Sequence, residues 1–417
     1  MTASARTAVV VGGGVIGAAC AHFLAKSGWN VDIIDQGEFG KACSHANCGY
    51  VCPSHVLPLA EPGAVWRTLK AMFRKDSPFY IKPRIDLALW GWLTRFMARC
   101  KPQFVLSAGQ AIQALLNSSR ALYEELIQKE PLACEWQARG MLFVFQTPPA
   151  MEHYAATDHF LREHFGLGAE QITPDKLVTM EPALKPGLAG GWYYNSDAHL
   201  RPDRLMAAWK AKLMARGVRI HERCAYQGLI SEQGRVRAVR SANGELPADA
   251  VVIATGAWTP LFQRDLGCKV PIQPGKGYSI TMPRPARCPT YPLIFEEHRV
   301  AVTPMESSYR LGSTMEFAGY DASLNPKRLA LLREGARHYL HEPFTELVTE
   351  EWYGWRPMTP DSLPIIGPTP AFSNVILAAG HNMLGLSMAP ATGKLVAELL
   401  NGEKPHVDPT PYAVTRF

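Results

Sequence analysis

A strand, a glycine-rich turn, a helix and a second strand follow one another near the start of the chain and constrain its fold most. The β-branched run Ala8–Val11 leads into the turn Gly12–Gly17. Apolar residues then recur at helical spacing as far as Gly28, and Val31–Asp35 follows as a second apolar strand. Such a βαβ unit packs as a parallel pair of strands with a right-handed crossover. The sequence therefore predicts a Rossmann-like α/β domain.

The glycine-rich turn also predicts a phosphate-binding site. Gly12 permits a tight turn, Gly14 lets the backbone approach a pyrophosphate, and Gly17 lets the helix pack against the strand. Asp35, at the end of the second strand, is placed to accept hydrogen bonds from a ribose. We expect a dinucleotide here, with a purely structural turn as the alternative, and these residues do not distinguish NAD from FAD. The expected contacts come from Gly12, Gly14, Val15, Ile16, Gly17, Asp35 and Gln36.

Length and composition are those of an ordinary globular protein. The 417 residues are 47% hydrophobic and 19% charged, which suits two domains. A net charge of +6, without a Lys/Arg-rich run, gives no reason to expect a nucleic-acid partner. No apolar run reaches the roughly eighteen residues of a membrane span, and residues 1–6 are too short for a signal peptide. We expect a cytoplasmic protein whose nine cysteines are reduced.

Nucleotide-binding elements return in the middle and at the end of the chain. They comprise a helix at 205–213, strands at 218–220, 251–254 and 375–378, hairpin turns at Gln233-Gly234 and Asn243-Gly244, and a terminal helix with Leu395 and Leu399. Between them we expect a helix at 109–127 and antiparallel strands at 141–145, 278–282, 300–303 and 309–312. Residues 1–80, 190–262 and 348–417 are thus predicted to form the nucleotide-binding domain. Residues 81–189 and 263–347 are predicted to form an inserted α+β substrate domain.

Four stretches have a specific order and spacing. They are Ser44–Gly49 followed by Pro53, Val251–Trp258, Gly275–Ser279, and Gly354–Asp361 continuing through Pro364 to Gly367. Together with both ends of the chain, they resemble the D-amino-acid oxidase superfamily of flavoproteins, most closely the bacterial D-amino-acid dehydrogenase small-subunit type. The resemblance implies an FAD domain of the glutathione-reductase type. It also implies noncovalent FAD, because no cysteine lies in the C-terminal motif where sarcosine-oxidase relatives attach flavin.

The resemblance further implies which residues contact the flavin. Those expected along the ring and ribityl chain are Ser44, Asn47, Gly49, Tyr50 and Val51. Those expected near the adenine or pyrophosphate are Ala225, Ala254, Thr255 and Gly256. Those expected near the isoalloxazine are Gly380, Asn382, Met383, Leu384 and Gly385, and Gly354 is assigned to the same cofactor site.

The stretch Gly380–Gly385 has a rationale of its own, because it lies between an expected strand and an expected helix. Amide groups at that helix N-terminus would face the flavin pyrimidine edge. Negative charge accumulates there when flavin is reduced, and a helix dipole stabilises it. An ordinary strand-to-helix turn is the alternative interpretation.

The substrate site is predicted from the chemistry of an amino acid. A bidentate guanidinium fixes a carboxylate best, and Arg356 stands in the motif position that resembles this clamp in related enzymes. The alternative is an Arg356 that pairs with Asp361 or caps carbonyl groups. Hydride transfer to flavin N5 depends chiefly on orientation, so we expect no obligate nucleophile or base. Secondary candidates, each of which can equally be structural, are Tyr50, Tyr278 and His381.

Two other clusters invite functional interpretations. Cys43, Cys48 and Cys52 lack a C-x-x-C spacing, so we expect packed thiols and no metal site. Residues 64–104 mix aromatic and basic side chains, as at a membrane interface. Electron delivery to a membrane quinone from the inner face is therefore one hypothesis, and helices that pack on the domain core are the other. The aromatic and aliphatic members are Trp66, Leu69, Met72, Phe73, Trp90, Trp92, Leu93 and Phe96.

The function best supported by the sequence is FAD-dependent oxidation of a D-amino acid or cyclic imino acid, such as D-proline or hydroxyproline, to the imine. A dehydrogenase is favoured over an oxidase. One alternative keeps the flavin and oxidises a 2-hydroxy acid. Another is a flavin subunit that docks onto partner proteins in a larger oxidoreductase, and an oligomer is compatible with either.

Overall fold

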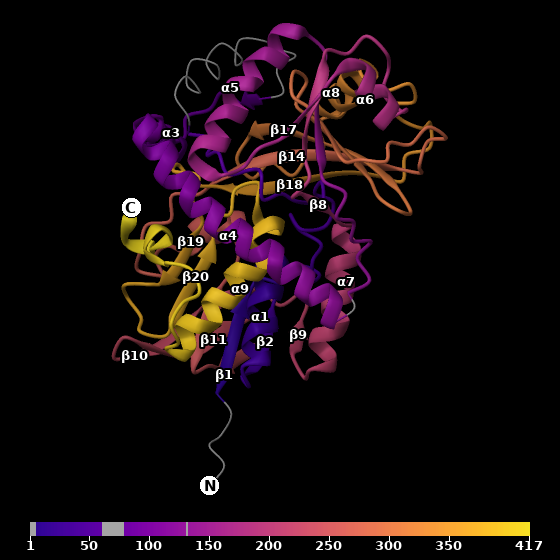
Figure 1. Ribbon diagram of the computed structural model, residues 1–417. Coiled ribbons are helices and arrows are strands. Elements are labelled where there is room, and N and C mark those ends of the chain that lie inside the picture. Colours follow the sequence, from indigo (N-terminus) through magenta and orange to yellow (C-terminus); the bar gives the residue numbers. More distant parts are fainter. Residues whose placement is uncertain (1–5, 61–78, 131) are drawn as a thin grey trace.

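The computed structural model describes residues 6–60, 79–130 and 132–417. Two main sheets dominate these residues, a six-stranded one in the lower half of Figure 1 and a nine-stranded one in the upper half. The mixed α/β fold expected from the sequence is confirmed. The hydrophobic and basic residues at 64–75 lie outside the described residues.

The six-stranded sheet contains the N-terminal βαβ unit. Its strands follow the order β19, β20, β13, β1, β2 and β9, and all pair in parallel except β19 with β20. Their bounds are β1 (Thr7–Val11), β2 (Asn30–Ile34), β9 (Arg219–His221), β13 (Ala250–Ile253), β19 (Ile365–Pro368) and β20 (Val375–Ala379). Helix α1 (Val15–Lys26) makes the predicted crossover from β1 to β2. Every carboxyl end of β1, β2, β13 and β20 therefore meets the same edge of the sheet.

Both faces of this sheet are covered, which explains why β1, β13 and β20 are almost entirely apolar. Helix α1, α4 (Pro102–Lys129), α7 (Pro202–Ala215) and α9 (Gly385–Asn401) contribute to the core on one face. The other face packs on β10 (Tyr226–Glu232), β11 (Arg235–Ser241) and β12 (Gly244–Pro247). The first predicted hairpin turn, Gln233-Gly234, is confirmed. The second is wrong by one residue: Ser241 pairs with Gly244, so Ala242 and Asn243 form the turn.

The nine-stranded sheet is largely antiparallel. Its order is β18, β14, β17, β16, β15, β5, β7 and β6, and β4 pairs with β17. The bounds are β4 (Phe79–Ile81), β5 (Met141–Phe145), β6 (Glu170–Ile172), β7 (Gly190–Tyr194), β14 (Gln273–Met282), β15 (Leu293–Phe295), β16 (Val300–Pro304), β17 (Tyr309–Phe317) and β18 (Glu350–Met358). Strands β7 and β18 both belong to this sheet. The predicted domain limits at 190 and 348 had assigned both strands to the nucleotide-binding domain. The proposed division into domains otherwise stays a prediction.

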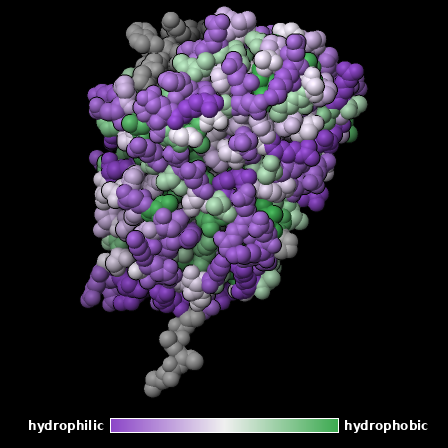
Figure 2. All heavy atoms as spheres, in the orientation of Figure 1, coloured by the Kyte–Doolittle hydropathy of each residue, from purple (hydrophilic) through white to green (hydrophobic). Residues whose placement is uncertain are grey.

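The remaining elements connect and cover the two sheets. They are β3 (Tyr50–Val51) paired with β8 (Ala198–His199), α3 (Leu87–Arg99), α5 (Pro148–Phe165), α6 (Pro174–Met180), α8 (Pro326–Arg337), and the short helices η1 (Gly256–Phe262), η2 (Thr410–Tyr412) and η3 (Val414–Arg416). Among the described ranges, no helix combines the length and apolar character needed to cross a bilayer. On the face shown in Figure 2, hydrophobic residues form small groups among hydrophilic ones.

Candidate active site

A cavity of about 790 Å³ runs between the two sheets. It begins at the glycine-rich turn after β1, passes the loop before β3 and the end of β13, and reaches the glycine-rich part of β14 and β18. The turn between β20 and α9 forms another wall. The carboxyl edge of the parallel sheet thus opens into the space that the antiparallel sheet closes, which is where open α/β folds bind ligands.

Two glycines of the turn after β1 are fixed by close backbone contacts. Gly12 has a φ of +110°, and a Cβ there would lie 2.5 Å from the carbonyl oxygen of Ala254. A Cβ on Gly17 would lie 1.9 Å from the Gly12 carbonyl oxygen. Gly14 differs, because an added Cβ would meet nothing closer than the Ser44 hydroxyl at 3.4 Å and its backbone lines the cavity. The turn therefore forms an open backbone cradle of the kind that a pyrophosphate occupies.

Polar contacts hold this cradle in place. Ser44 Oγ accepts a hydrogen bond from the Val15 amide at 2.9 Å and so caps α1. Asp35 accepts from the amides of Gly13 at 2.7 Å and Gly37 at 2.8 Å. The Asp35 carboxylate keeps further lone pairs and lines the cavity, so its role toward a ribose stays a prediction.

Most residues predicted to bind the cofactor line the cavity. They are Gly12, Gly14, Val15, Ile16, Asp35, Gln36, Ser44, Asn47, Gly49, Tyr50, Ala254, Thr255, Gly256, Gly354, Asn382, Met383, Leu384 and Gly385. Four do not: Gly17 packs on Gly12, Val51 is 1% exposed within β3, Ala225 accepts a hydrogen bond from Ala242, and Gly380 faces the Thr359 methyl group. Their backbone positions shape the walls without forming the cavity surface.

The turn between β20 and α9 is locked by one asparagine side chain. Asn382, at a φ of +53°, accepts from the Thr359 amide at 2.9 Å and donates to the Gly380 carbonyl at 3.0 Å. Residues from His381 to Ser387 line the cavity, and α9 begins at Gly385. The helix N-terminus consequently lies at the cavity wall, as the strand-to-helix argument predicted.

The loop from Ser44 to Cys52 is held against the antiparallel sheet by side chains that were not among the predicted site residues. Arg310, 1% exposed, donates to the Asn47 carbonyl at 2.8 Å. Ser279 donates to the Ala46 carbonyl and Thr303 to the Cys48 carbonyl, both at 2.7 Å. The strands that carry these three side chains are distant in sequence from the loop. Of the three residues, only Ser279 belongs to a stretch quoted in the sequence analysis.

Arg356 lies on the cavity face of β18. A Cβ on Gly277 would come within 2.4 Å of Arg356 Nη2, so the guanidinium lies across that glycine. Arg356 Nη1 donates to the Thr314 carbonyl at 2.7 Å. A β-bulge presents this carbonyl, with φ values of +112° at Ser313 and +53° at Thr314. Such backbone strain next to a cavity is typical of a functional site.

Of the alternative contacts expected for Arg356, the pairing with Asp361 is wrong, whereas a carbonyl contact is present at Thr314. Asp361 pairs with Arg416 at 2.8 Å. Within residues 6–60, 79–130 and 132–417, no carboxylate forms an ion pair with Arg356. Burial lowers the pKa of the guanidinium, with the strongest opposing effect from Cys48, and a guanidinium stays charged at neutral pH. The cavity therefore contains a cation that lacks a protein counter-ion in the described structure.

The three secondary candidates line the cavity, and each has a hydrogen bond within the protein. Tyr50 donates to the Val302 carbonyl at 2.8 Å, and the Tyr278 hydroxyl donates to Glu316. His381 Nε2 lies 3.0 Å from Thr392 Oγ1, and burial lowers the His381 pKa to about 3. These contacts favour structural roles, and catalytic roles for them stay predictions.

Sequence reasoning missed several cavity residues. Trp352 lies over Gly354, because a Cβ on that glycine would come within 2.2 Å of the indole. The alternation of β18 places Trp352 on the same face as Gly354 and Arg356, but Trp352 lies two residues before the quoted motif. Glu296 and Arg299, an ion pair of 2.7 Å at the cavity wall, had no such signal.

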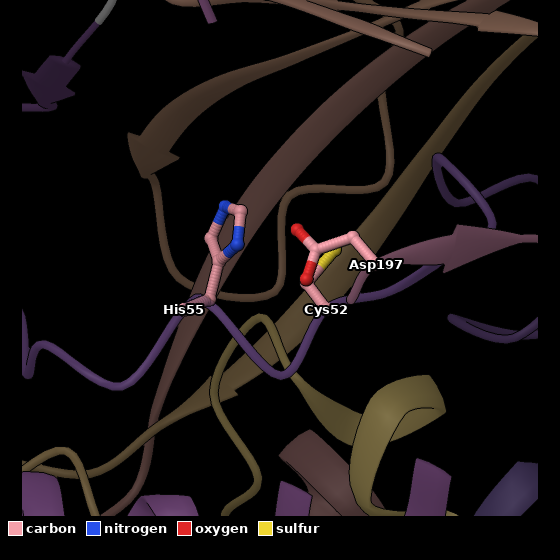
Figure 3. Close-up of side chains that lie close together, drawn as sticks. All are labelled: Cys52, His55 and Asp197. Carbon is pink, nitrogen blue, oxygen red and sulfur yellow. The ribbon is translucent and has the colours of Figure 1, made fainter. Parts of the chain in front are cut away.

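The cysteine-rich loop contributes to a mixed group of side chains. Donor atoms of Cys52, His55 and Asp197 all lie within 4.8 Å of one another (Figure 3). Cys52 and His55 come from the loop after β3, and Asp197 precedes β8. The expectation of no metal site stays a prediction.

Comparison with known proteins identifies the family. Residues 7–399 match the model of the DAO family, described as FAD dependent oxidoreductase. The chain belongs to this family. A D-amino acid dehydrogenase of Paramagnetospirillum magneticum is 34% identical over 417 residues, which cover 98% of each chain. One of Granulibacter bethesdensis is 32% identical and covers 98% of this chain and 99% of the relative.

Solved structures show the same fold. Glycine oxidase from Geobacillus kaustophilus is 23% identical with a TM-score of 0.79, and the match covers 99% of each chain. L-proline dehydrogenase from P. horikoshii is 20% identical with a TM-score of 0.73 and covers 99% of this chain and 98% of the other.

The residues present fit FAD, the cofactor of the family. Gly14 leaves the phosphate cradle open, and the first-turn amides of α1 follow it. Trp355 Nε1 at the cavity wall is a buried donor that has no acceptor among the described residues. A bound dinucleotide would extend from this cradle toward the turn before α9.

Proposed function

We propose that this member of the FAD-dependent oxidoreductases oxidises a D-amino acid or cyclic imino acid to the imine, with Arg356 holding the substrate carboxylate. The curated relatives named D-amino acid dehydrogenase support the substrate class. The observation that carries the proposal is the cavity-facing Arg356, whose Nη1 is oriented by Thr314 and which has no carboxylate partner in the described structure. A substrate carboxylate would supply the missing counter-ion.

The chain's own residues bind and orient the substrate. Arg356 is half-buried at the cavity wall, so a carboxylate that pairs with its guanidinium loses part of its water and is held more strongly than at an open surface. Trp352 adjoins the clamp on the same strand face and can cover an apolar side chain or a proline ring. Bound FAD supplies the acceptor for a hydride. Orientation of the α-hydrogen is then the main requirement, and the described site needs no nucleophilic side chain for it.

The direct test is anaerobic bleaching of the yellow holoprotein with single compounds. The panel contains D- and L-amino acids, D-proline, hydroxyprolines, sarcosine and 2-hydroxy acids. We expect D-amino acids or cyclic imino acids to remove the flavin absorption band. Bleaching by 2-hydroxy acids alone would replace the proposal with a hydroxy-acid dehydrogenase. A holoprotein that no compound reduces would favour a flavin subunit that docks onto other proteins.

We also propose that electrons pass to a quinone at a membrane surface. Ile85, Leu87, Trp90 and Met97, on and before α3, are 99%, 86%, 59% and 48% exposed. The exposed cation Arg95 lies on the same helix. Apolar side chains beside a cation suit a lipid interface with anionic headgroups.

The membrane interpretation applies to only part of α3. Trp92 is 5% exposed, donates to the Met358 carbonyl and packs with Leu93 and Phe96 in a small core. Flotation of the protein with anionic vesicles tests the exposed face. Leu87→Asp combined with Trp90→Asp should abolish flotation, whereas Thr179→Asp, at an exposed position of α6, should not. Absence of wild-type flotation at low salt would contradict the membrane proposal.

A further inference from the structure

A hydrogen-bonded chain of three side chains connects a buried carboxylate with the cavity. Ser54 Oγ donates to Asp197 Oδ2 at 2.5 Å and lies 3.2 Å from His55 Nδ1. A hydroxyl has one hydrogen, so a Ser54 that donates to Asp197 can only accept from His55. His55 Nδ1 then carries the ring proton, and Nε2 has a free lone pair. His55 lines the cavity, whereas Asp197, the residue before β8, is fully buried and does not line it; Figure 3 shows the two side chains next to each other.

Asp197 is suited to hold a proton. It is 0% exposed and has no ion pair with any residue that the structure describes. Its other hydrogen bonds come from the Ser54 amide at 3.1 Å and Ser196 Oγ at 3.3 Å. Burial raises its pKa to about 7. A carboxyl group with that pKa exchanges a proton close to neutral pH.

The surroundings of Asp197 do not provide a competing counter-ion. Arg120 of α4 is the cation that acts on Asp197, but it pairs with Glu124 at 2.6 Å. The titratable neighbours Cys52, Tyr193 and Tyr194 all have a pKa raised by burial. Burial lowers the His55 pKa to about 4, and the ring packs 5.6 Å from that of Phe143. A neutral imidazole with a free Nε2 accepts protons.

We propose that His55 accepts the proton that leaves the substrate ammonium group and that Ser54 relays a proton to Asp197. This role rests on the proposed amine oxidation, in which the amine must be neutral before hydride leaves. The ammonium N–H bond breaks as an N–H bond forms at His55 Nε2. The Nδ1 proton passes to Ser54 Oγ, whose own proton passes to Asp197. The net result is the transfer of one proton from the substrate ammonium group to Asp197, whose carboxylate becomes a carboxylic acid. No electrons are transferred in this step.

The same donor atoms can also be considered as ligands of a metal ion, because sulfur, imidazole and carboxylate donors suit zinc. The hydrogen bonds favour the relay. Ser54 engages one Asp197 oxygen and lies at His55 Nδ1, the two positions that an ion between these groups would need. Stoichiometric zinc is therefore an outcome that overturns the relay.

Two serines provide a matched pair of variants. Both hydroxyls donate to Asp197, but only Ser54 also reaches His55. In holoprotein with nitrogen-labelled histidine, the His55 signal is assigned by its loss in His55→Asn. We expect the tautomer protonated at Nδ1, altered in Ser54→Ala and Asp197→Asn and unchanged in Ser196→Ala. This readout needs no substrate.

The second readout is the pH dependence of anaerobic flavin bleaching. In the wild type, the rate should fall as the pH decreases through about 7, because Asp197 then already holds a proton. Ser54→Ala should be slowed about 100-fold at neutral pH, the usual effect of lost general base catalysis, and should recover at high pH. Ser196→Ala should keep the wild-type profile.

The outcomes separate the two proposals. A wild type that is bleached, with an unchanged pH profile in Ser54→Ala and Asp197→Asn, overturns the relay alone. An Nε2-protonated His55, or zinc that is lost in Cys52→Ala but retained in Cys48→Ala, also overturns it. A wild type that no compound bleaches contradicts the amine oxidation and the relay role together.

Discussion

The two ends of the cavity are built in different ways. At the phosphate end, the surface is backbone, and Gly12, Gly14 and Gly17 all belong to one short turn. At the carboxylate end, one side chain, Arg356, projects from a strand whose neighbours lie dozens of residues away. A backbone site is specified by residues that are close in sequence. A side-chain site depends on the register of a sheet.

The glycines at the two ends also serve different purposes. Gly17 brings a helix into contact with a strand, so its missing side chain is a requirement of the fold. Gly277 leaves room for the guanidinium of Arg356, so its missing side chain is a requirement of the site. Substitution should therefore unfold the protein or remove FAD at one end, and impair catalysis in a folded, yellow protein at the other.

The largest effect is expected for Gly17→Ala. The new Cβ would lie 1.9 Å from the Gly12 carbonyl, and neither backbone segment can move without separating α1 from β1. Overpacking of this kind costs more than about 3 kcal/mol, and we expect a colourless or insoluble protein. Flavin absorption per protein and thermal unfolding measure the effect.

Gly28→Ala is the matched control at the end of the same helix. A Cβ there meets nothing within 4 Å, although the φ of +83° carries strain. We expect a loss of about 1 kcal/mol and full flavin content. A yellow, stable Gly17→Ala protein would show that the close helix–strand contact is dispensable.

The second largest effect is expected for Arg356→Leu. Loss of a buried charge that pairs with the substrate costs about 2–5 kcal/mol, which corresponds to roughly a 30- to several-thousand-fold fall in kcat/KM. Flavin content should stay unchanged, because the cradle is at the other end. Arg299→Leu is the control, since Arg299 lines the same cavity but pairs with Glu296 at 2.7 Å. Equal kcat/KM in Arg356→Leu and wild type would contradict the proposal that Arg356 binds the substrate carboxylate.

This contrast also explains what could be predicted from the sequence. The strands around Gly12–Gly17, the crossover helix and the strand-to-helix turn near Asn382 carry local signals, and the structure places them as expected. The bulge at Ser313, the anchor Arg310 and the pair of Asp361 with Arg416 depend on pairing between distant segments. No local pattern encodes such pairings, so they became visible only with the register of the sheet.

Acid stability tests two buried histidines that line the cavity. Burial lowers the pKa of His381, in the turn before α9, to about 3, and that of His55, in the loop after β3, to about 4. Unfolded histidine binds a proton below about pH 6.5, so both groups reduce stability as the pH falls from there toward 4. Asp197 has the opposite effect on stability. Because its pKa is raised in the folded state, the folded protein is stabilised as the pH falls below about 7 and Asp197 becomes protonated.

Each proton that the unfolded state binds in excess of the folded state changes the free energy of unfolding by about 1.4 kcal/mol per pH unit. Unfolding by urea at pH 5 and pH 7 should show a smaller loss of stability on acidification in His381→Asn than in the wild type. In Asp197→Asn the loss on acidification should instead be larger. An identical pH dependence in all three proteins would contradict the buried, neutral state of His381.

The smallest effect is expected for Gly277→Ala. This variant tests the difference between the two ends of the cavity most directly. The new Cβ would lie 2.4 Å from Arg356 Nη2, the flexible end of a side chain that can move aside. Stability should change by less than about 1 kcal/mol, while the displaced guanidinium should lower kcat/KM about 10-fold. Gly275→Ala, whose Cβ would meet the flexible Met358 at 2.7 Å on the same strand, is the control and should leave kcat/KM unchanged. Equal kinetics in both variants would mean that the position of Arg356 is not critical, and the carboxylate end would then resemble an ordinary sheet surface rather than a preorganised clamp.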